Sequence, residues 1–529
     1  MKKIIAAILS VAVCASVCLS AGCGGTGNVS TDEFAYRTEE KADYMDSVYL
    51  TDYITALGEE ELADFAAEGN SNRQGTGTKG IAVSSYYTTR VNGEEAYTYM
   101  VFTAETTPHS FVLLDVSEDR FEGGKTLEIE LSATFDVEKA IVLPEKLGVE
   151  PTVSEGRTVR FTVSDYGTYT LIVNDERAPQ NSYTLFVRRP EKVEVPYGYT
   201  LIEYKPGLHF VDGITLTSNT ILYLHAGALL VATGEPGSGA GTGTGITGFI
   251  NASNAENVKI VGHGVIDLSR IPWGQNRGIY MNVCNNVEID GVTLINSATW
   301  SMMYSYCSDL TIRDCIVFGC RQNSDGYAIC SSRDVVVSDC FARSGDDLFE
   351  VKTYGDVAEN ILFENCIAWP DNCRGFGIIQ ETNSDIKGVT YRNCSLLYQL
   401  NDWSEKMASF VITAGESGNV SEILFEDCDL FYSSVYAIRF SVGANDETSG
   451  VSDFSNTITD VTFRNCDFKY PSSSRGIVKF RNVTDNPSAI SGILFENVTF
   501  GGVKLTSFAD LNPTYEGYSA EETPAVTVK

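Results

Sequence analysis

The stretch Leu310-Thr311-Ile312-Arg313-Asp314-Cys315 decides the fold, because its pattern returns at nearly regular intervals. The same order of apolar, variable, apolar and polar residues, followed by Asp or Asn and then Cys, occurs at residues 335–340, 361–366 and 389–394. The cysteines that end these units lie 25, 26 and 28 residues apart. A unit of this size holds a few short strands and their turns, and stacked units bury one continuous core.

The repeat extends beyond these four units. It continues at residues 423–428, 461–466 and 493–498, and weaker members precede it at 258–260 and 287–292. No segment of helix length separates the units, and crossovers between parallel strands are almost always right-handed. The sequence therefore predicts an all-β fold, a right-handed parallel β-helix over residues 196–505. The later steps of 34 and 38 residues predict loops inserted on one face, where binding usually occurs.

The cysteines are predicted to be buried small apolar residues rather than a disulfide framework. Beyond residue 23 there are eleven, an odd number, and most recur at the last position of the repeat. Cys320 and Cys373 fall outside that position, so each is a candidate for a bridge or a free thiol. We find no Cys-x-x-Cys pair or histidine cluster typical of zinc, and predict no metal site.

A second domain is predicted before the repeat. Residues 80–195 alternate apolar and polar positions in short runs, such as 127–131 and 158–163, separated by turn residues. This pattern is typical of a β-sandwich. Residues 23–79 are polar, glycine-rich and acidic, which predicts a tether and a poorly ordered segment. Residues 506–529 are predicted to form a C-terminal tail.

Residues 1–22 are typical of a signal peptide. Lys2 and Lys3 precede a short apolar run, and Leu-Ser-Ala-Gly-Cys follows at residues 19–23. That motif resembles a bacterial lipobox, which implies cleavage before Cys23 and lipidation of its side chain. We therefore expect a protein anchored by lipid on the extracellular side of a bacterial membrane.

Charge excludes one class of partner. The chain carries 38 Lys and Arg against 70 Asp and Glu, a formal net charge of −32. No basic stripe is available to neutralise phosphates, so a nucleic-acid partner is not expected.

The glycine-rich run 237–248 lacks the lysine of a P-loop, and no cofactor is predicted. We expect a monomer.

Three aspartates stand in register before equivalent strands of two successive units. Asp325 precedes residues 327–329, and the pair Asp346 and Asp347 precedes residues 348–351. Neighbouring strands lie ~4.8 Å apart, so these carboxylates should converge and at least one pKa should rise. A proton donor beside a carboxylate that activates water is the arrangement that glycoside hydrolysis needs. The alternative is that the three aspartates merely occupy turns.

At this point the sequence resembles the polygalacturonase-like glycoside hydrolases, which adopt the pectin-lyase-like right-handed β-helix. The resemblance covers about residues 200–400 and rests on residues 262–267, 296–300, 323–325 and 345–347 with Lys352, in order and spacing. A sandwich before the helix is also similar to the layout of dextranases. The resemblance implies inverting hydrolysis, with Asp346 as the candidate general acid, and with Asp325 and Asp347 as the two candidate carboxylates that activate water.

Two departures from that family change the expected substrate. Phe376 occupies the place of the family's catalytic histidine, and residues 407–413 lack the Arg-x-Lys pair that reads galacturonate carboxylates. A neutral glycan is therefore favoured over pectin. The alternatives left open are a pectin hydrolase, a Ca²⁺-dependent polysaccharide lyase, and a β-helix surface protein that binds glycans without cutting them.

Substrate-binding candidates flank the aspartates. Arg374 could hold a carboxylate or bind a sugar hydroxyl, although it could equally be a surface residue. Aromatic rings offer stacking platforms for sugars but more often pack in a core. The full set of candidates is Arg374, Lys352, Trp300, Tyr327, Phe376 and Gln380.

Overall fold

The structure is a computed structural model that describes residues 27–30, 80–103, 107–117, 119–233, 247–400, 404, 406–443, 455–471, 476–519 and 522–529. The expected signal peptide, Cys23 and most of the tether lie outside these residues, as do positions 237–246 of the glycine-rich run. Apart from three short 3-10 turns, η2 (Glu122–Gly124), η3 (Glu145–Leu147) and η4 (Phe508–Leu511), the described part of the chain contains only strands and connections. None of its helical segments has the length and apolar character needed to cross a membrane.

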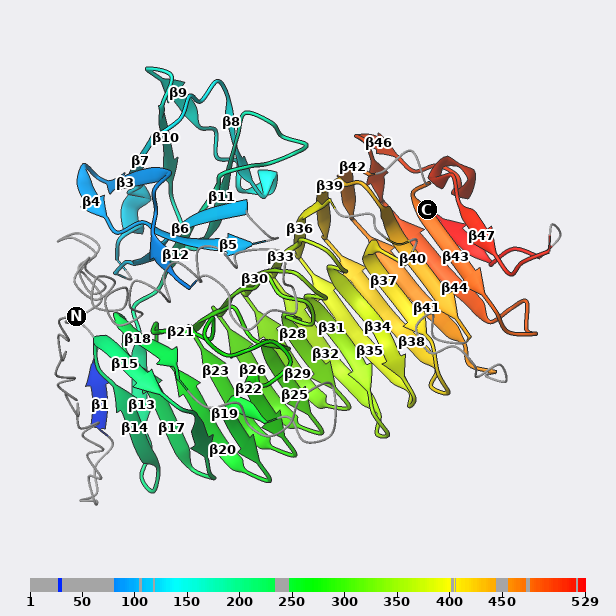
Figure 1. The fold of residues 1–529 in the computed structure, drawn as a ribbon. Helices are drawn as coiled ribbons and strands as arrows, with labels where there is room; N and C mark the ends of the chain where they lie inside the picture. Colours follow the sequence, from blue (N-terminus) through cyan, green and yellow to red (C-terminus); the bar gives the residue numbers. More distant parts are fainter. Residues whose placement is uncertain are drawn as a thin grey trace, which may run out of the picture.

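The C-terminal two thirds form a right-handed parallel β-helix of three long sheets, as the sequence predicts (Figure 1). The first sheet contains β14 (Thr200–Tyr204), β17 (Thr220–Leu224), β20 (Glu256–Val261), β23 (Asn285–Asp290), β26 (Ser308–Arg313), β29 (Arg333–Ser338), β32 (Ala358–Glu364), β35 (Ile386–Arg392), β38 (Val420–Glu426), β41 (Ile458–Arg464), β44 (Ile490–Glu496) and β48 (Val526–Val528). The second contains β15 (Gly207–Val211), β18 (Ala228–Ala232), β21 (Val265–Asp267), β24 (Thr293–Ile295), β27 (Ile316–Phe318), β30 (Phe341–Ser344), β33 (Ile367–Pro370), β36 (Ser395–Gln399), β39 (Asp429–Ser433), β42 (Asp467–Tyr470), β45 (Thr499–Phe500) and β46 (Val503–Lys504).

The third sheet carries the candidate site and is called the site sheet below. It contains β16 (Ile214–Leu216), β19 (Gly248–Ser253), β22 (Arg277–Asn282), β25 (Met302–Ser305), β28 (Tyr327–Cys330), β31 (Phe349–Thr353), β34 (Phe376–Thr382), β37 (Ala408–Ala414), β40 (Tyr436–Val442), β43 (Val478–Asn482) and β47 (Thr514–Glu516). β47 pairs with β43, and β48 pairs with β44. The predicted C-terminal tail is therefore wrong, because residues after 506 add strands to the stack.

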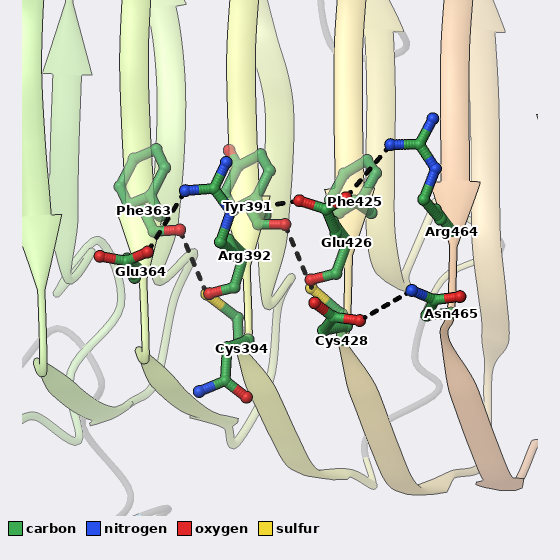
Figure 2. Close-up of polar contacts among 12 residues, drawn as sticks. Phe363, Glu364, Tyr391, Arg392, Cys394, Phe425, Glu426, Cys428, Arg464 and Asn465 are labelled. Atoms are coloured by element: carbon green, nitrogen blue, oxygen red, sulfur yellow. Dashed lines mark hydrogen bonds and ion pairs between the residues drawn. The ribbon is translucent and has the colours of Figure 1, made fainter.

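The repeat motif ends each strand of the first sheet at a turn. The Asp or Asn before each cysteine has a positive φ, for example 52° at Asp314 and 56° at Asn365. Asp and Asn tolerate this left-handed conformation better than other residues with a side chain. The following cysteine then points inward, where Cys394 Sγ donates to the carbonyl of Phe363 at 3.6 Å (Figure 2). The repeat cysteines are buried, and Cys320 and Cys373 are not joined in a disulfide.

Residues before the β-helix form two mostly antiparallel sheets that share one apolar core. One sheet has the order β4 (Glu94–Ala96), β3 (Tyr87–Val91), β7 (Leu127–Ala133), β10 (Thr158–Val163) and β9 (Thr152–Ser154). The other has the order β2 (Ala82–Val83), β5 (Tyr99–Thr103), β6 (Thr107–Asp115), β12 (Ser182–Arg188), β11 (Gly167–Val173) and β8 (Ala140–Leu143). In addition, β1 (Gly27–Ser30) pairs with β13 (Lys192–Val195).

The sandwich lies over the second sheet of the β-helix (Figure 1). Phe111 and Phe186 of the sandwich contact Phe318 of β27, with ring centroids 5.0 and 6.2 Å apart. Charged groups also bridge the two domains, since His263 Nδ1 lies 2.8 Å from Asp115 Oδ1. The sandwich therefore packs on the second sheet of the β-helix and not on the site sheet.

Candidate active site

The three aspartates lie on neighbouring coils, directly before strands of the site sheet. Asp325 precedes β28, and Asp346 and Asp347 precede β31. The backbone ladder stacks these segments: Gly326 N–H donates to the carbonyl of Asp347 at 2.7 Å, and Leu348 N–H donates to that of Arg374 at 3.1 Å. The predicted register thus places the carboxylates on one edge of successive coils.

Asp347 is held by the next coil. The backbone N–H of Arg374 donates to Asp347 Oδ1 at 2.9 Å, and Arg374 Nη1 donates to Oδ2 at 2.8 Å. Both side chains are buried. A charge-assisted pair with two hydrogen bonds fixes the orientation of the carboxylate and neutralises its charge.

Asp346 points toward the preceding coil and is only half-buried. Asn323 N–H donates to its Oδ2 at 2.8 Å, and Asp347 N–H donates to its Oδ1 at 3.0 Å. Burial and the neighbouring Asp347 raise the pKa of Asp346 to about 6. A carboxyl group that titrates near neutrality and reaches solvent can deliver a proton.

Asp325 belongs to a buried cluster with a fourth carboxylate, Glu350. Oxygens of Asp325, Asp347 and Glu350 lie within 4.8 Å of one another. Burial, with the charges of Glu350 and Asp346, raises the pKa of Asp325 well above its usual value. Burial also raises the pKa of Glu350 to about 8, although Lys352 opposes the shift.

Lys352 supplies the positive charge within this cluster. Its Nζ lies 3.0 Å from Glu350 Oε2, 3.3 Å from Glu381 Oε2 and 3.6 Å from Asp325 Oδ2. Burial alone would lower the Lys352 pKa, but the carboxylates of Glu350 and Glu381 outweigh burial and raise it. Carboxylates at this spacing could in principle ligate a metal ion, yet Lys352 and Arg374 already balance two of them.

These groups open into a cleft of about 570 Å³. Trp300 forms one wall of this cleft. Its ring stacks on the ring of Tyr354, with the centroids 6.4 Å apart, and the Lys352 ammonium lies 4.8 Å from the Trp300 ring centroid. The residues that line the cleft are Trp300, Gln322, Asn323, Asp325, Gly345, Asp346, Lys352, Tyr354, Cys373, Arg374, Gln380, Glu381 and Met407. A partly apolar cleft with a few convergent polar groups suits a small ligand such as a sugar.

Comparison with known proteins places this arrangement in a family. The profile described as "Glycosyl hydrolases family 28" matches residues 238–514, slightly more than half of the chain and all of the residues above. The chain belongs to glycosyl hydrolase family 28. Two exopolygalacturonases of Zea mays are similar, one of them 25% identical over 289 residues, which is 51% of this chain and 64% of the maize protein. The chain thus spans less than two thirds of these relatives.

One solved structure extends the likeness to the whole fold. Dex49A from Penicillium minioluteum superimposes with a TM-score of 0.56 over 87% of this chain and 97% of its own, at 14% identity. That likeness concerns the fold alone. It includes residues before the family 28 match, because the match begins at residue 238.

Two substrate-binding predictions for this family 28 chain are wrong. Tyr327 and Phe376 are fully buried, and each stacks on Phe349, with centroids 4.9 and 5.1 Å apart. Both take the inward positions of their strands, where side chains alternate between core and surface. The remaining candidates, Trp300, Lys352, Arg374 and Gln380, line the cleft.

Sequence reasoning missed Glu350, Tyr354 and Glu381. Glu350 lies in the run Phe349-Glu350-Val351-Lys352, which is read as an apolar strand, yet a charged pair at alternate positions on one face is a usable signal. Glu381 has no such signal. It reaches Lys352 because the register shifts between Val351 and Thr353, opposite Gln380, whose φ is 61°.

Proposed function

We propose that this family 28 chain is a glycoside hydrolase that cuts a polysaccharide with inversion at the anomeric carbon. The observation that carries the proposal is the pairing of Asp346, which titrates near pH 6 at the cleft, with the buried cluster of Asp325 and Asp347. One protonated carboxyl and one water-activating carboxylate are the groups that inverting hydrolysis uses.

The reaction divides between these residues. Asp346 donates its proton to the glycosidic oxygen, so the bond from that oxygen to the anomeric carbon breaks and a new hydroxyl forms. Asp325, with Asp347 beside it, takes a proton from a water whose oxygen bonds to the anomeric carbon from the opposite side. Arg374 holds Asp347 in place during this step. The water leaves one hydrogen on the new anomeric hydroxyl and gives the other to Asp325, while the hydroxyl of the leaving group carries the proton from Asp346. Net transfer of one proton from Asp325 to Asp346 through solvent then restores both carboxyl groups.

A neutral glycan is the favoured substrate. The cations that line the described cleft, Lys352 and Arg374, are both ion-paired with carboxylates of the protein. Asp325, Asp346 and Glu381 also line it. An added uronate carboxylate would meet like charge there, which costs binding energy unless a cation faces it. The resemblance to exopolygalacturonases favours the second candidate, a galacturonan.

A screen of polysaccharides separates the two candidates. We expect reducing ends to be released from a neutral polymer such as dextran, and little from polygalacturonate. Proton NMR of the first product should show the anomeric configuration opposite to that of the substrate. Preferred release from polygalacturonate would support the second candidate, and retention of configuration would contradict inversion. Activity in excess chelator with no unsaturated product separates hydrolysis from lyase cleavage.

We also propose that Cys23 carries a lipid that keeps the enzyme on the outer side of a bacterial membrane. The support is the motif at residues 19–23. In a bacterial host the wild type should fractionate with membranes and Cys23→Ala should not. Equal partition of the two proteins would overturn this proposal.

A further inference from the structure

Glu350 occupies an unusual place for a carboxylate. It lies on β31, is fully buried, and stands between Ala328 of β28 and Gly377 of β34 in the ladder of the site sheet. These two neighbours contribute almost no side-chain volume. The space beside the Glu350 side chain is therefore open to the aspartates that precede β28 and β31, which are the proposed catalytic carboxylates Asp325 and Asp347.

The contacts of Glu350 are with Lys352 and the aspartates. Its Oε2 is ion-paired with Lys352 Nζ at 3.0 Å, and its carboxylate lies within 4.8 Å of oxygens of Asp325 and Asp347. Asp325 Oδ1 and Glu350 Oε1 are buried, and neither has a hydrogen-bond partner among the described residues. Buried carboxylate oxygens without a donor are costly, so a proton between two of them would be strongly favoured.

The charge around Glu350 supports retention of that proton. In the part of the chain that the structure describes, the cations near the cluster, Arg277, Lys352 and Arg374, are fewer than its carboxylates, which are Asp325, Asp346, Asp347, Glu350 and Glu381. Arg374 pairs with Asp347, and Lys352 is shared by three acidic groups. Like charges this close in a buried site cannot all ionise, and they titrate as a coupled set. The titratable groups that interact electrostatically with Glu350 are Asp325, Cys330, Asp347, Lys352, Tyr354 and Tyr391. Arg277 and Asp346 act on Asp325, Arg374 pairs with Asp347, and Glu381 pairs with Lys352.

We propose that Glu350 is a positioning residue that shares one proton with Asp325 and so orients this carboxylate toward the attacking water. The inference rests on the proposed hydrolysis and adds a residue to it. While Glu350 holds the proton, its O–H donates to one oxygen of Asp325, and the other oxygen of Asp325 accepts the proton of the water. When the shared proton is lost at alkaline pH, this orientation is lost with it.

Glu350→Gln mimics the protonated state permanently, because the amide donates a hydrogen bond at every pH. Its kcat/KM should stay within about tenfold of the wild type near pH 6. Since the Glu350 pKa is about 8, the ratio of mutant to wild-type kcat/KM should then rise by about tenfold by pH 9. Glu350→Ala, which offers no donor, should be impaired at both values. An unchanged ratio, or a Gln variant as poor as the Ala variant, would overturn the inference.

Thermal unfolding tests the shared proton without any substrate. The folded protein should keep a proton on the Asp325 and Glu350 pair that the unfolded chain loses near pH 4–5, so wild-type stability should fall as pH rises from 5 toward 8. Glu350→Gln should show a shallower fall. A matched control is Glu359→Gln on β32, whose carboxylate pairs with Lys387 at 3.1 Å on the first sheet. This control should follow the wild-type curve.

These arms separate the two proposals. If no glycan is cleaved but the unfolding curves differ as expected, the hydrolase proposal fails and the shared proton stands. Parallel unfolding curves, with glycan cleavage intact, overturn the shared proton alone. Should Glu350→Gln not fold, infrared spectra of the wild type provide the measurement: a protonated carboxyl band must be present at pH 7 and lost by pH 9, and its absence at pH 7 overturns the inference.

Discussion

Two rows of charged side chains on the same β-helix are built in opposite ways. On the first sheet, the charged residues alternate in sign along successive coils, and each inner member contacts a partner on both sides; they are Glu364, Arg392, Glu426, Arg464 and Glu496. Figure 2 shows the part of this ladder from Glu364 to Arg464. On the site sheet, the acidic groups Asp325, Asp347 and Glu350 converge within 4.8 Å.

The difference teaches what each row is for. The ladder members are partly exposed, and alternation satisfies every charge at little cost. The site members are buried, with the half-buried Asp346 beside Asp347, and carry excess negative charge. This charge destabilises the fold locally but raises the pKa values of Asp325 and Asp346 toward those that proton transfer needs. Changes of carboxylate to amide should therefore have opposite effects on stability in the two rows.

The largest effect is expected on catalysis. Asp346→Asn and Asp325→Asn should each lower kcat by about a thousandfold or more, because each removes a group that moves a proton in the transition state. Release of reducing ends from the best polysaccharide substrate is the measurement. A kcat within tenfold of the wild type for either variant would remove that aspartate from the mechanism.

The next effect concerns Arg374. Arg374→Met should lower the free energy of unfolding by about 3–5 kcal/mol, because it leaves Asp347 buried without its cation. Denaturant unfolding measures the change. Arg374→Lys keeps the charge but not the fork of donors, and should recover part of the loss. Equal stability of all three proteins would show that Asp347 has another partner.

A smaller effect, of opposite sign, is expected for Asp346→Asn on stability. The folded pKa of Asp346, about 6, is above its unfolded value, so its contribution is present at low pH and lost as pH rises through 6. The variant should be more stable than the wild type at pH 7, by roughly 1–2 kcal/mol. At pH 4 the difference should vanish. Melting temperatures at the two pH values provide the comparison, and a wild type that is more stable at pH 7 contradicts it.

The smallest effect is expected in the ladder. Glu426→Gln should destabilise by no more than about 1 kcal/mol, since Arg392 and Arg464 lower the Glu426 pKa from a partly exposed position. That contribution is present above the usual glutamate pKa and is lost as pH falls through the lowered value. The effect should shrink in high salt. A stabilising result would erase the contrast between the two rows.

Much of the fold follows from the sequence because its signal repeats. The turn position before each cysteine of the repeat has a positive φ, which favours Asp or Asn, and this preference recurs at Asp314, Asp339 and Asn365. Asp325, Asp346 and Asp347 inherit their placement from this register. The last coil is less regular. Its strands β47 and β48, at residues 514–516 and 526–528, lack the repeat motif, and for this reason the sequence predicts a tail there instead of strands.

The details of the site depend on features that one strand does not encode. Whether Phe376 faces the cleft or the core depends on the phase of its strand, and the inward phase becomes clear only from the stack with Phe349 and Phe410. Glu381 meets Lys352 through an irregular register, which no periodic pattern predicts. Only Glu350 could have been found from the alternation of its strand.

The register shift beside Gln380 has a consequence for how a polymer lies on this protein. Where successive strands of a sheet stay in register, each coil presents the same backbone pattern to a ligand that runs along the stack. The irregular strand β34 breaks that pattern at one coil. If a glycan lies along these coils, we expect this irregular coil, where Glu381 meets Lys352, to fix its position relative to the aspartates.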